Sequence, residues 1–89
     1  MIKIRVKVYL SLIEKLGWHE KEVVLDDDAT INDLLEKLPE LKNILYKYRE
    51  KTIQPTIMIN GRRIEFLGGL QAKLKHSNTV SIFPPAAGG

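Results

Sequence analysis

The residues that could do chemistry stand at the end of the chain: Pro84, Pro85, Ala86, Ala87, Gly88 and Gly89. Gly88 and Gly89 have no Cβ, so this backbone could enter a slot too narrow for a side chain. The α-carboxylate of Gly89 would be ionised at neutral pH, with a pKa of about 3.5. Pro84 and Pro85 fix φ and lack an N–H, so they cannot continue a hydrogen-bonded strand. We therefore expect a stiff, protruding tail that presents the carboxylate to another protein's active site; the alternative is an ordinary frayed terminus.

The rest of the sequence offers little chemistry of its own. It contains no cysteine, which excludes a disulfide framework, a thiolate metal site and a cysteine nucleophile. Asp26, Asp27 and Asp28 lack the alternate spacing and central glycine of a calcium loop, and the Walker phosphate-loop pattern is absent. His19 has no recognisable catalytic partner. We expect no metal site, no cofactor bound by this chain and no independent enzyme activity.

Length and charge set further bounds. A chain of 89 residues forms one domain with a thin core. Lys3, Arg5 and Lys7 interrupt the apolar run at the N-terminus, so neither a signal peptide nor a membrane span is expected there. We expect a cytoplasmic protein. The net charge of +3 leaves nucleic-acid binding open as an alternative, but aromatic residues are too few to favour it.

The first third of the chain predicts a hairpin with a short helical turn. Aliphatic and polar side chains alternate over residues 2–9, which indicates a half-buried strand. Ser11 and Glu14 match a capping box, and Gly17 is a plausible helix C-cap, so a turn is expected over residues 12–16. Residues 22–25 predict a second strand that runs back along the first.

The middle of the chain predicts a helical layer. Thr30 is a good N-cap with Asp33 three residues later, and apolar residues follow at helical spacing to residue 38. Pro39 is compatible with the first turn of a second helical segment.

The final third predicts three more strands. Asn60-Gly61 between two β-prone runs, residues 56–59 and 62–65, marks a type I′ hairpin. Residues 79–83 form the last strand, with Val80 and Ile82 facing inward and Phe83 outward.

This order of elements predicts a two-layer α+β domain. The main helix comes between two groups of strands, so the first and last strands can lie side by side and parallel in the centre of a mixed sheet. That is the β-grasp, or ubiquitin-like, arrangement. We expect a β-grasp domain over residues 1–83, with one main helix packed on one face, and a protruding Gly-Gly tail over residues 84–89.

Three stretches resemble the ubiquitin-like sulfur carriers, most closely the small subunit of molybdopterin synthase. They are Val-Ser-Ile-Phe-Pro-Pro-Ala-Ala-Gly-Gly at residues 80–89, Met-Ile-Asn-Gly-Arg-Arg-Ile at residues 58–64, and Thr-Ile-Asn-Asp-Leu-Leu at residues 30–35. Residues 75–78 depart from the family, because Lys-His-Ser-Asn replaces its common Asp-Gly-Asp turn. Two other groups share this plan and remain alternatives for the function. They are sulfur carriers for thiamine or tRNA thiolation, and protein modifiers that would be joined through Gly89 to lysines.

The resemblance implies a mechanism and partners. An adenylyltransferase-type activating enzyme would use ATP and magnesium to adenylate Gly89, and a sulfur source would convert the acyl-adenylate to a thiocarboxylate. The sulfur would pass to an acceptor such as the large subunit of molybdopterin synthase. This chain would be a sulfur-donating cosubstrate or non-catalytic subunit.

The outer sheet face is a candidate partner-binding surface, expected to gather Lys3, Arg5, Lys7, Met58, Arg63 and Phe83. Phe83, beside the tail, is a candidate interface anchor, with Met58, Arg63 and Arg5 around it. The alternative for the basic residues is an ordinary solvated strand face.

Overall fold

The computed structural model describes residues 1–48 and 53–85. In this part of the chain five strands form one sheet, in the order β2-β1-β5-β3-β4. The strands are β1 (Ile2–Val8), β2 (Glu20–Leu25), β3 (Thr56–Ile59), β4 (Arg62–Arg63) and β5 (Thr79–Phe83). The helices are α1 (Ser11–Leu16), α2 (Ile31–Glu36) and α3 (Pro39–Tyr48), and two short 3₁₀ turns, η1 (Ile64–Phe66) and η2 (Gly69–Gln71), lie between β4 and β5.

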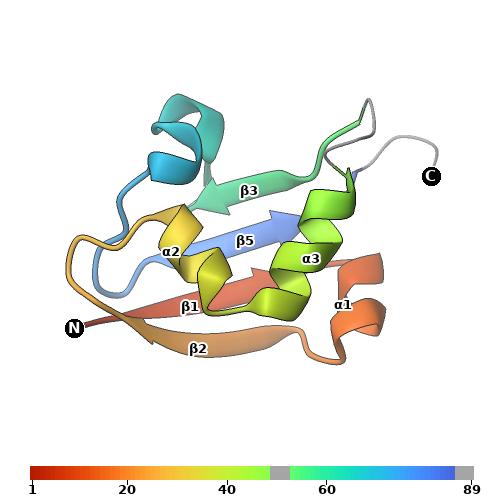
Figure 1. Cartoon of the computed structure of the whole chain (residues 1–89), viewed down its shortest axis with the longest axis horizontal. Coiled ribbons are helices and arrows are strands. Elements are labelled where there is room, and N and C mark those ends of the chain that lie inside the picture. The colour runs from red at the N-terminus through yellow and green to blue at the C-terminus, as the bar shows by residue number, and fades with distance from the viewer. Residues whose placement is uncertain (49–52, 86–89) are drawn as a thin grey trace.

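The first and last strands lie parallel in the middle of the sheet, as the sequence predicted (Figure 1). Val6 pairs with Val80 and Val8 with Ile82. β2 runs antiparallel to β1, and β3 runs antiparallel to β5. The predicted β-grasp fold is therefore confirmed, and β5 is held on both sides by backbone hydrogen bonds.

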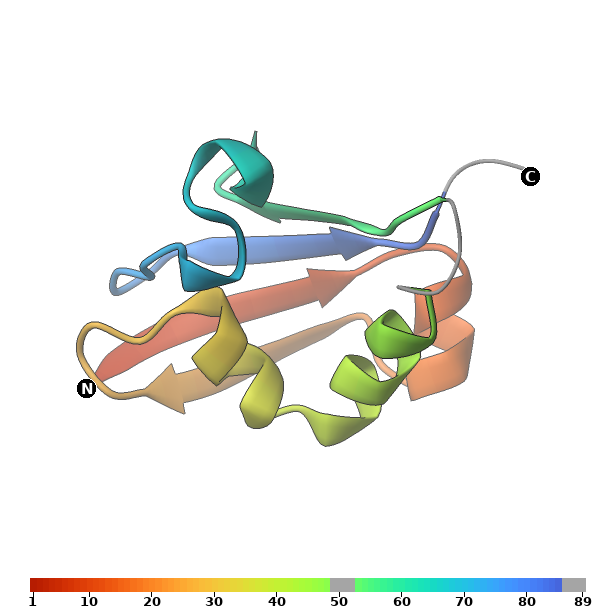
Figure 2. The same cartoon turned by 45° about the horizontal axis from the view of Figure 1, so that its top comes forward.

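One face of the sheet carries the core. α2 and α3 cross this face, and α1 lies at the end where β1 finishes (Figures 1 and 2). Alternate residues of the central strands point under the helices and are buried: Ile4, Val6, Val8, Ile57, Ile59, Val80 and Ile82. Each fully buried aliphatic side chain contributes about 1.5–3 kcal/mol relative to exposure. The opposite face has no helix over it in the described part of the chain, and we call it the open face.

The helical layer is made of two helices, and the second begins at Pro39, where the sequence was compatible with a second helical segment. Thr30 caps α2 as predicted: its Oγ1 accepts the backbone N–H of Asp33 at 3.2 Å, and its own N–H donates to the Asp33 carboxylate at 2.9 Å. α2 ends at Glu36, and α3 begins at Pro39. Proline has no N–H and its ring clashes with the preceding turn, so it starts a new helix more readily than it continues one.

The capping box predicted at Ser11 is wrong. α1 begins at Ser11 itself, and Leu10 is its N-cap, with φ 56° and no side-chain cap. The backbone N–H groups of Leu12 and Ile13 donate to the carbonyls of Tyr9 and Leu10, so the chain turns one residue earlier than the side-chain pattern indicated. The glycine C-cap at Gly17 is confirmed, with φ 82°.

The predicted hairpin is confirmed at its turn and shortened in its second strand. Asn60 and Gly61 both have positive φ, 49° and 82°, as a type I′ turn requires, and Met58 pairs with Arg63. The strand expected over residues 62–65 stops at Arg63, because the chain turns into a 3₁₀ helix that buries Ile64.

Candidate functional site

The candidate site is the end of the sheet where the chain leaves β5. Ala86, Ala87, Gly88 and Gly89 lie outside the described residues, so their role in presenting the carboxylate stays a prediction. Pro84 is buried and Pro85 half-buried. The packed part of the chain thus includes Pro84.

An aromatic cluster formed by Tyr9, His19 and Phe83 lies beside this exit. The rings of Tyr9 and Phe83 stack with centroids 4.4 Å apart and planes 9° from parallel. His19 meets Tyr9 edge-on at 5.3 Å, and its Nδ1–H donates to the carbonyl of Val8 at 2.8 Å. Ring pairs of this kind contribute about 0.5–1.5 kcal/mol beyond area burial. The stack therefore fixes the position of the Phe83 ring at the end of β5.

Phe83 is half-buried, whereas the sequence predicted an exposed ring. The parallel pairing of Val8 with Ile82 brings the next residues of both strands, Tyr9 and Phe83, together on the open face. The backbone N–H of Tyr9 also donates to the carbonyl of Ile82 at 3.1 Å. The prediction missed this pairing partner, although the alternation of β1 already placed Tyr9 on the outer face.

The other predicted contact residues share the open face but lie at different distances from the exit. Met58 pairs with Ser81 and with Arg63, so these side chains form the row next to Phe83. Arg5 pairs with Thr79, at the opposite end of β5. The register therefore places Met58 one row from Phe83 on the neighbouring strand, Arg63 beyond Met58 on β4, and Arg5 at the far end of the strand pair. The binding role of all four stays a prediction.

The expected basic character of the open face is offset by carboxylates from β2. The antiparallel register sets Glu20 opposite Lys7 and Glu22 opposite Arg5. Arg5 Nε lies 3.0 Å from the carboxylate of Glu20, and Lys7 and Lys3 lie 4.0 Å from Glu20 and Glu22. This face is therefore an exposed surface of mixed charge.

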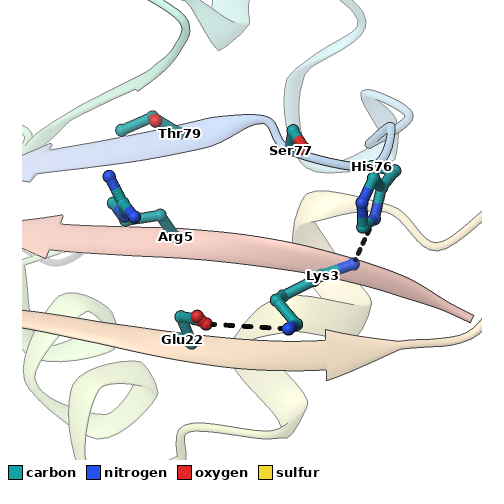
Figure 3. Close-up of a pocket in the computed structure, with 6 residues that line it drawn as sticks. All are labelled: Lys3, Arg5, Glu22, His76, Ser77 and Thr79. Carbon is teal, nitrogen blue, oxygen red and sulfur yellow. Dashed lines mark hydrogen bonds and ion pairs between the residues drawn. The ribbon is translucent and has the colours of Figure 1, made fainter.

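A polar hollow of about 270 Å³ at the start of β5 is lined by Lys3, Arg5, Glu22, His76, Ser77 and Thr79 (Figure 3). The backbone N–H of Lys3 donates to Nδ1 of His76 at 3.1 Å, and the N–H of Ser77 donates to the carbonyl of Lys3 at 2.9 Å. These bonds fasten the loop before β5 to the start of β1. The hollow lies at the other end of β5 from Phe83 and is not part of the candidate site.

Leu10 adds a residue that the sequence analysis did not select. It is 69% exposed, follows Tyr9 directly and has φ 56°. A positive φ is uncommon for a leucine, and here it accompanies a side chain that lies in solvent. No sequence signal pointed to it, because the conformation arises from the turn between β1 and α1.

The shifted pKa values in the described part of the chain belong to groups away from this site. The pKa of Asp27 is lowered by a hydrogen bond from the Met1 amino group, whose own pKa is raised by the same contact. A hydrogen bond to Glu36 raises the pKa of Lys42. Residues 1–48 and 53–85 contain no group of three or more metal-ligating side chains.

No helix within the described ranges is both long enough and apolar enough to cross a membrane.

Comparisons with known proteins match this chain over nearly its whole length. The sequence profile of the ThiS family matches residues 6–89. Small archaeal modifier protein 3 of Haloferax volcanii is 29% identical, over 99% of this chain and 100% of the relative. The solution structure of small archaeal modifier protein 1 from Methanosarcina acetivorans is 32% identical, with a TM-score of 0.75 over 100% of this chain and 98% of that chain. A candidate molybdopterin converting factor subunit 1 from Pyrococcus furiosus is 26% identical, with a TM-score of 0.69 over 97% and 100% of the two chains.

Proposed function

Because this chain belongs to the ThiS family of ubiquitin-like sulfur carriers, we propose that it carries sulfur as a thiocarboxylate on Gly89. Its relatives are small carrier or modifier proteins, and this chain is likewise not an enzyme on its own. The observation that supports the proposal most is the position of β5. This central strand ends at Phe83, and the sequence beyond it reads Pro-Pro-Ala-Ala-Gly-Gly.

The chemistry follows from the properties of a carboxylate. As an anion it is a poor acyl donor, but it can attack the α-phosphorus of ATP in a partner enzyme and release pyrophosphate. The resulting acyl-adenylate has AMP as a good leaving group. Sulfide attacks the carbonyl carbon and displaces AMP, which leaves the thiocarboxylate. If a persulfide attacks instead, the product is an acyl disulfide, and a thiol must then reduce its S–S bond to release the thiocarboxylate, the thiol ending in a disulfide. ATP and magnesium act at the activating enzyme, and the proposal therefore locates the reaction in the cytoplasm, where ATP is available.

The contribution of this chain is delivery. Gly88 and Gly89 carry no side chain, so the reacting carbonyl can pass into a narrow channel of the partner. Pro84, packed into the domain, fixes where the tail begins. We infer that the stacked rings of Tyr9 and Phe83 are the anchor on which the activating enzyme or the sulfur acceptor docks. Aromatic residues that are rigid before binding are typical of such anchors.

For the acceptor, we propose the large subunit of a molybdopterin synthase. The identity to the candidate molybdopterin converting factor of Pyrococcus furiosus supports this choice. A second function, conjugation of Gly89 to lysines of target proteins, is favoured by the identity to the two archaeal modifier proteins. Both functions begin with the same adenylated terminus and differ in the nucleophile that takes the acyl or sulfur group.

The test uses purified protein, a cognate activating enzyme, ATP and a sulfide source. Intact mass spectrometry should show one oxygen replaced by one sulfur, and a variant that lacks Gly88 and Gly89 should show no change while keeping its fold. The proposal would be contradicted if the mass of the wild-type protein stayed unchanged while the same enzyme preparation adenylated another carrier.

The two functions separate in a second assay. Conjugation to lysine leaves adducts that survive reducing and denaturing gels and disappear in the variant without Gly88 and Gly89. Sulfur transfer leaves none, and instead the addition of the acceptor enzyme with its pterin precursor returns the carrier to its starting mass.

A further inference from the structure

A second hollow, of about 410 Å³, lies under the β3–β4 hairpin and has a different character from the open face. We call it the basic hollow. The residues that give it its character are Asn60, Arg62, Leu67, Lys73, Lys75 and Asn78. Its lining includes three cationic side chains and no carboxylate. The hollow therefore gathers three positive charges with no carboxylate in its lining.

The three cations are free to act on a ligand. Among the described residues, the side chains of Arg62, Lys73 and Lys75 form neither an ion pair nor a hydrogen bond, and all three are exposed. Lys73 and Lys75 alternate with the buried Leu74, so both extend outward from the same segment. On the open face, by contrast, Arg5 already has Glu20 at 3.0 Å.

The amide side chains of the hollow are fixed with their donors left over. Oδ1 of Asn60 accepts the backbone N–H of Thr79, and Oδ1 of Asn78 accepts the backbone N–H of Lys75, each at 2.8 Å. With the carbonyl oxygens engaged, the amide nitrogens remain available as donors. The hollow therefore presents cations and N–H donors around the apolar side chain of Leu67, a pattern that suits a ligand rich in acceptor oxygens.

The basic hollow lies at the opposite end of β5 from the tail. The backbone N–H of Asn60 donates to the carbonyl of Thr79, the first residue of β5, whereas the tail follows Phe83, the last. At about 3.3 Å per residue, the four steps of the strand separate these ends by about 13 Å. A partner bound in the hollow would leave the aromatic cluster and the end of β5 accessible.

We propose that the basic hollow docks an acidic, extended segment of a partner protein, with carboxylates on Arg62, Lys73 and Lys75 and an apolar side chain on Leu67. A protein segment suits the hollow better than a nucleic acid does. No aromatic ring lines it, so bases would have no surface on which to stack, whereas Leu67 and the amide groups fit side chains and backbone of a peptide.

The test is a titration of the ¹⁵N-labelled full chain with a soluble peptide in which glutamates flank a single leucine. Chemical-shift changes should concentrate at Arg62, Leu67, Lys73 and Lys75. The affinity should fall with added salt, because exposed charges are screened. Lys73→Gln/Lys75→Gln should weaken binding about fivefold or more, as expected for two exposed ion pairs.

A matched control removes the same charge elsewhere. Lys37→Gln/Lys47→Gln takes two lysines from the helical layer and should change the affinity by less than about twofold. A lysine–leucine peptide of reversed charge should not bind. Equal losses in the two double variants, or shift changes centred on Arg5 and Lys7, would overturn the proposal. A single-stranded uridine oligonucleotide that binds the hollow more tightly than the acidic peptide would overturn it in favour of nucleic acid.

This docking is independent of the reaction at Gly89. The variant without Gly88 and Gly89 should bind the acidic peptide as tightly as the complete chain. Loss of peptide binding in that variant would contradict the separation of the two sites, and a failed thiocarboxylate assay would leave the docking result unaffected.

Discussion

Replacing Phe83 by alanine tests whether the aromatic cluster is a rigid docking surface for the partner that acts on the tail. The ring centroids of Phe83 and Tyr9 lie 4.4 Å apart in the stack. The substitution removes the Phe83 ring and leaves the backbone pairing of β5 in place. Fully buried phenylalanines cost about 3–5 kcal/mol when truncated to alanine. Phe83 is half-buried, so we expect a loss of about 1.5–2.5 kcal/mol, which includes about 0.5–1.5 kcal/mol from the stack.

The stacking part can be isolated by a double-mutant cycle. Tyr9→Ala, Phe83→Ala and the double variant are compared in urea denaturation, followed by the fluorescence of Trp18, the single tryptophan. The coupling free energy should be about 0.5–1.5 kcal/mol. All variants should stay folded, because a domain of this kind is stable by about 5–15 kcal/mol.

The same variants then report on docking. If Phe83 is an anchor, its truncation should weaken binding to the activating enzyme by about 2 kcal/mol, or about thirtyfold. Phe66→Ala is the matched control, because Phe66 is 78% exposed and lies in η1, away from the tail. Coupling indistinguishable from zero, together with equal affinities of the two alanine variants, would refute the idea of a prepared docking surface.

The remaining predictions concern the scaffold and are read from urea or thermal unfolding. Thr30→Ala removes the cap of α2 and should cost about 1 kcal/mol; no loss would mean that tertiary packing alone holds this helix. Gly61→Ala should cost about 1–2 kcal/mol through its φ of 82° alone, since an added Cβ meets nothing within 4 Å; an unchanged stability would contradict the type I′ turn. Ile82→Ala, in the centre of the core, should cost about 2–5 kcal/mol, and a smaller loss would argue against the central position of β5. The raised pKa of Lys42 means that its bond to Glu36 stabilises the fold below pH 10.5 and is lost as the pH rises through the folded-state pKa; Glu36→Gln should abolish this alkaline dependence, and an unaltered pH profile would count against the contact.

The features that local sequence rules govern were predictable. Alternation in residues 2–9, the cap at Thr30 and the Asn60-Gly61 turn each depend on neighbouring residues, and the structure confirms all three. The order of elements then limited the sheet to a few topologies, of which the parallel central pair was correct.

The features that were missed depend on contacts between distant parts of the chain. Ser11 has the residue type of a cap, but the turn through Leu10 moved the start of α1 by one residue. The cations of β1 suggested a basic face, yet β2 supplies Glu20 and Glu22 opposite them. Tyr9 became significant only through the register that sets it against Phe83.

The basic hollow was not predicted because its cations come from separate segments of the chain. Arg62 comes from the β3–β4 hairpin, and Lys73 and Lys75 come from the connection before β5. Their sequence spacing carries no periodicity that would place them together. Only the folded connection between β4 and β5 assembles them.

The central claim is that sulfur is carried on Gly89, and fragmentation of the intact protein by mass spectrometry tests it most directly. The protein is isolated from its native cells under conditions that prevent hydrolysis. We expect a fraction of molecules to have one oxygen replaced by sulfur, and only fragments containing Gly89 to carry the change. Two results would contradict this claim. One is an additional sulfur on any residue other than Gly89, and the other is no additional sulfur on this protein in cells whose other carriers do hold a thiocarboxylate.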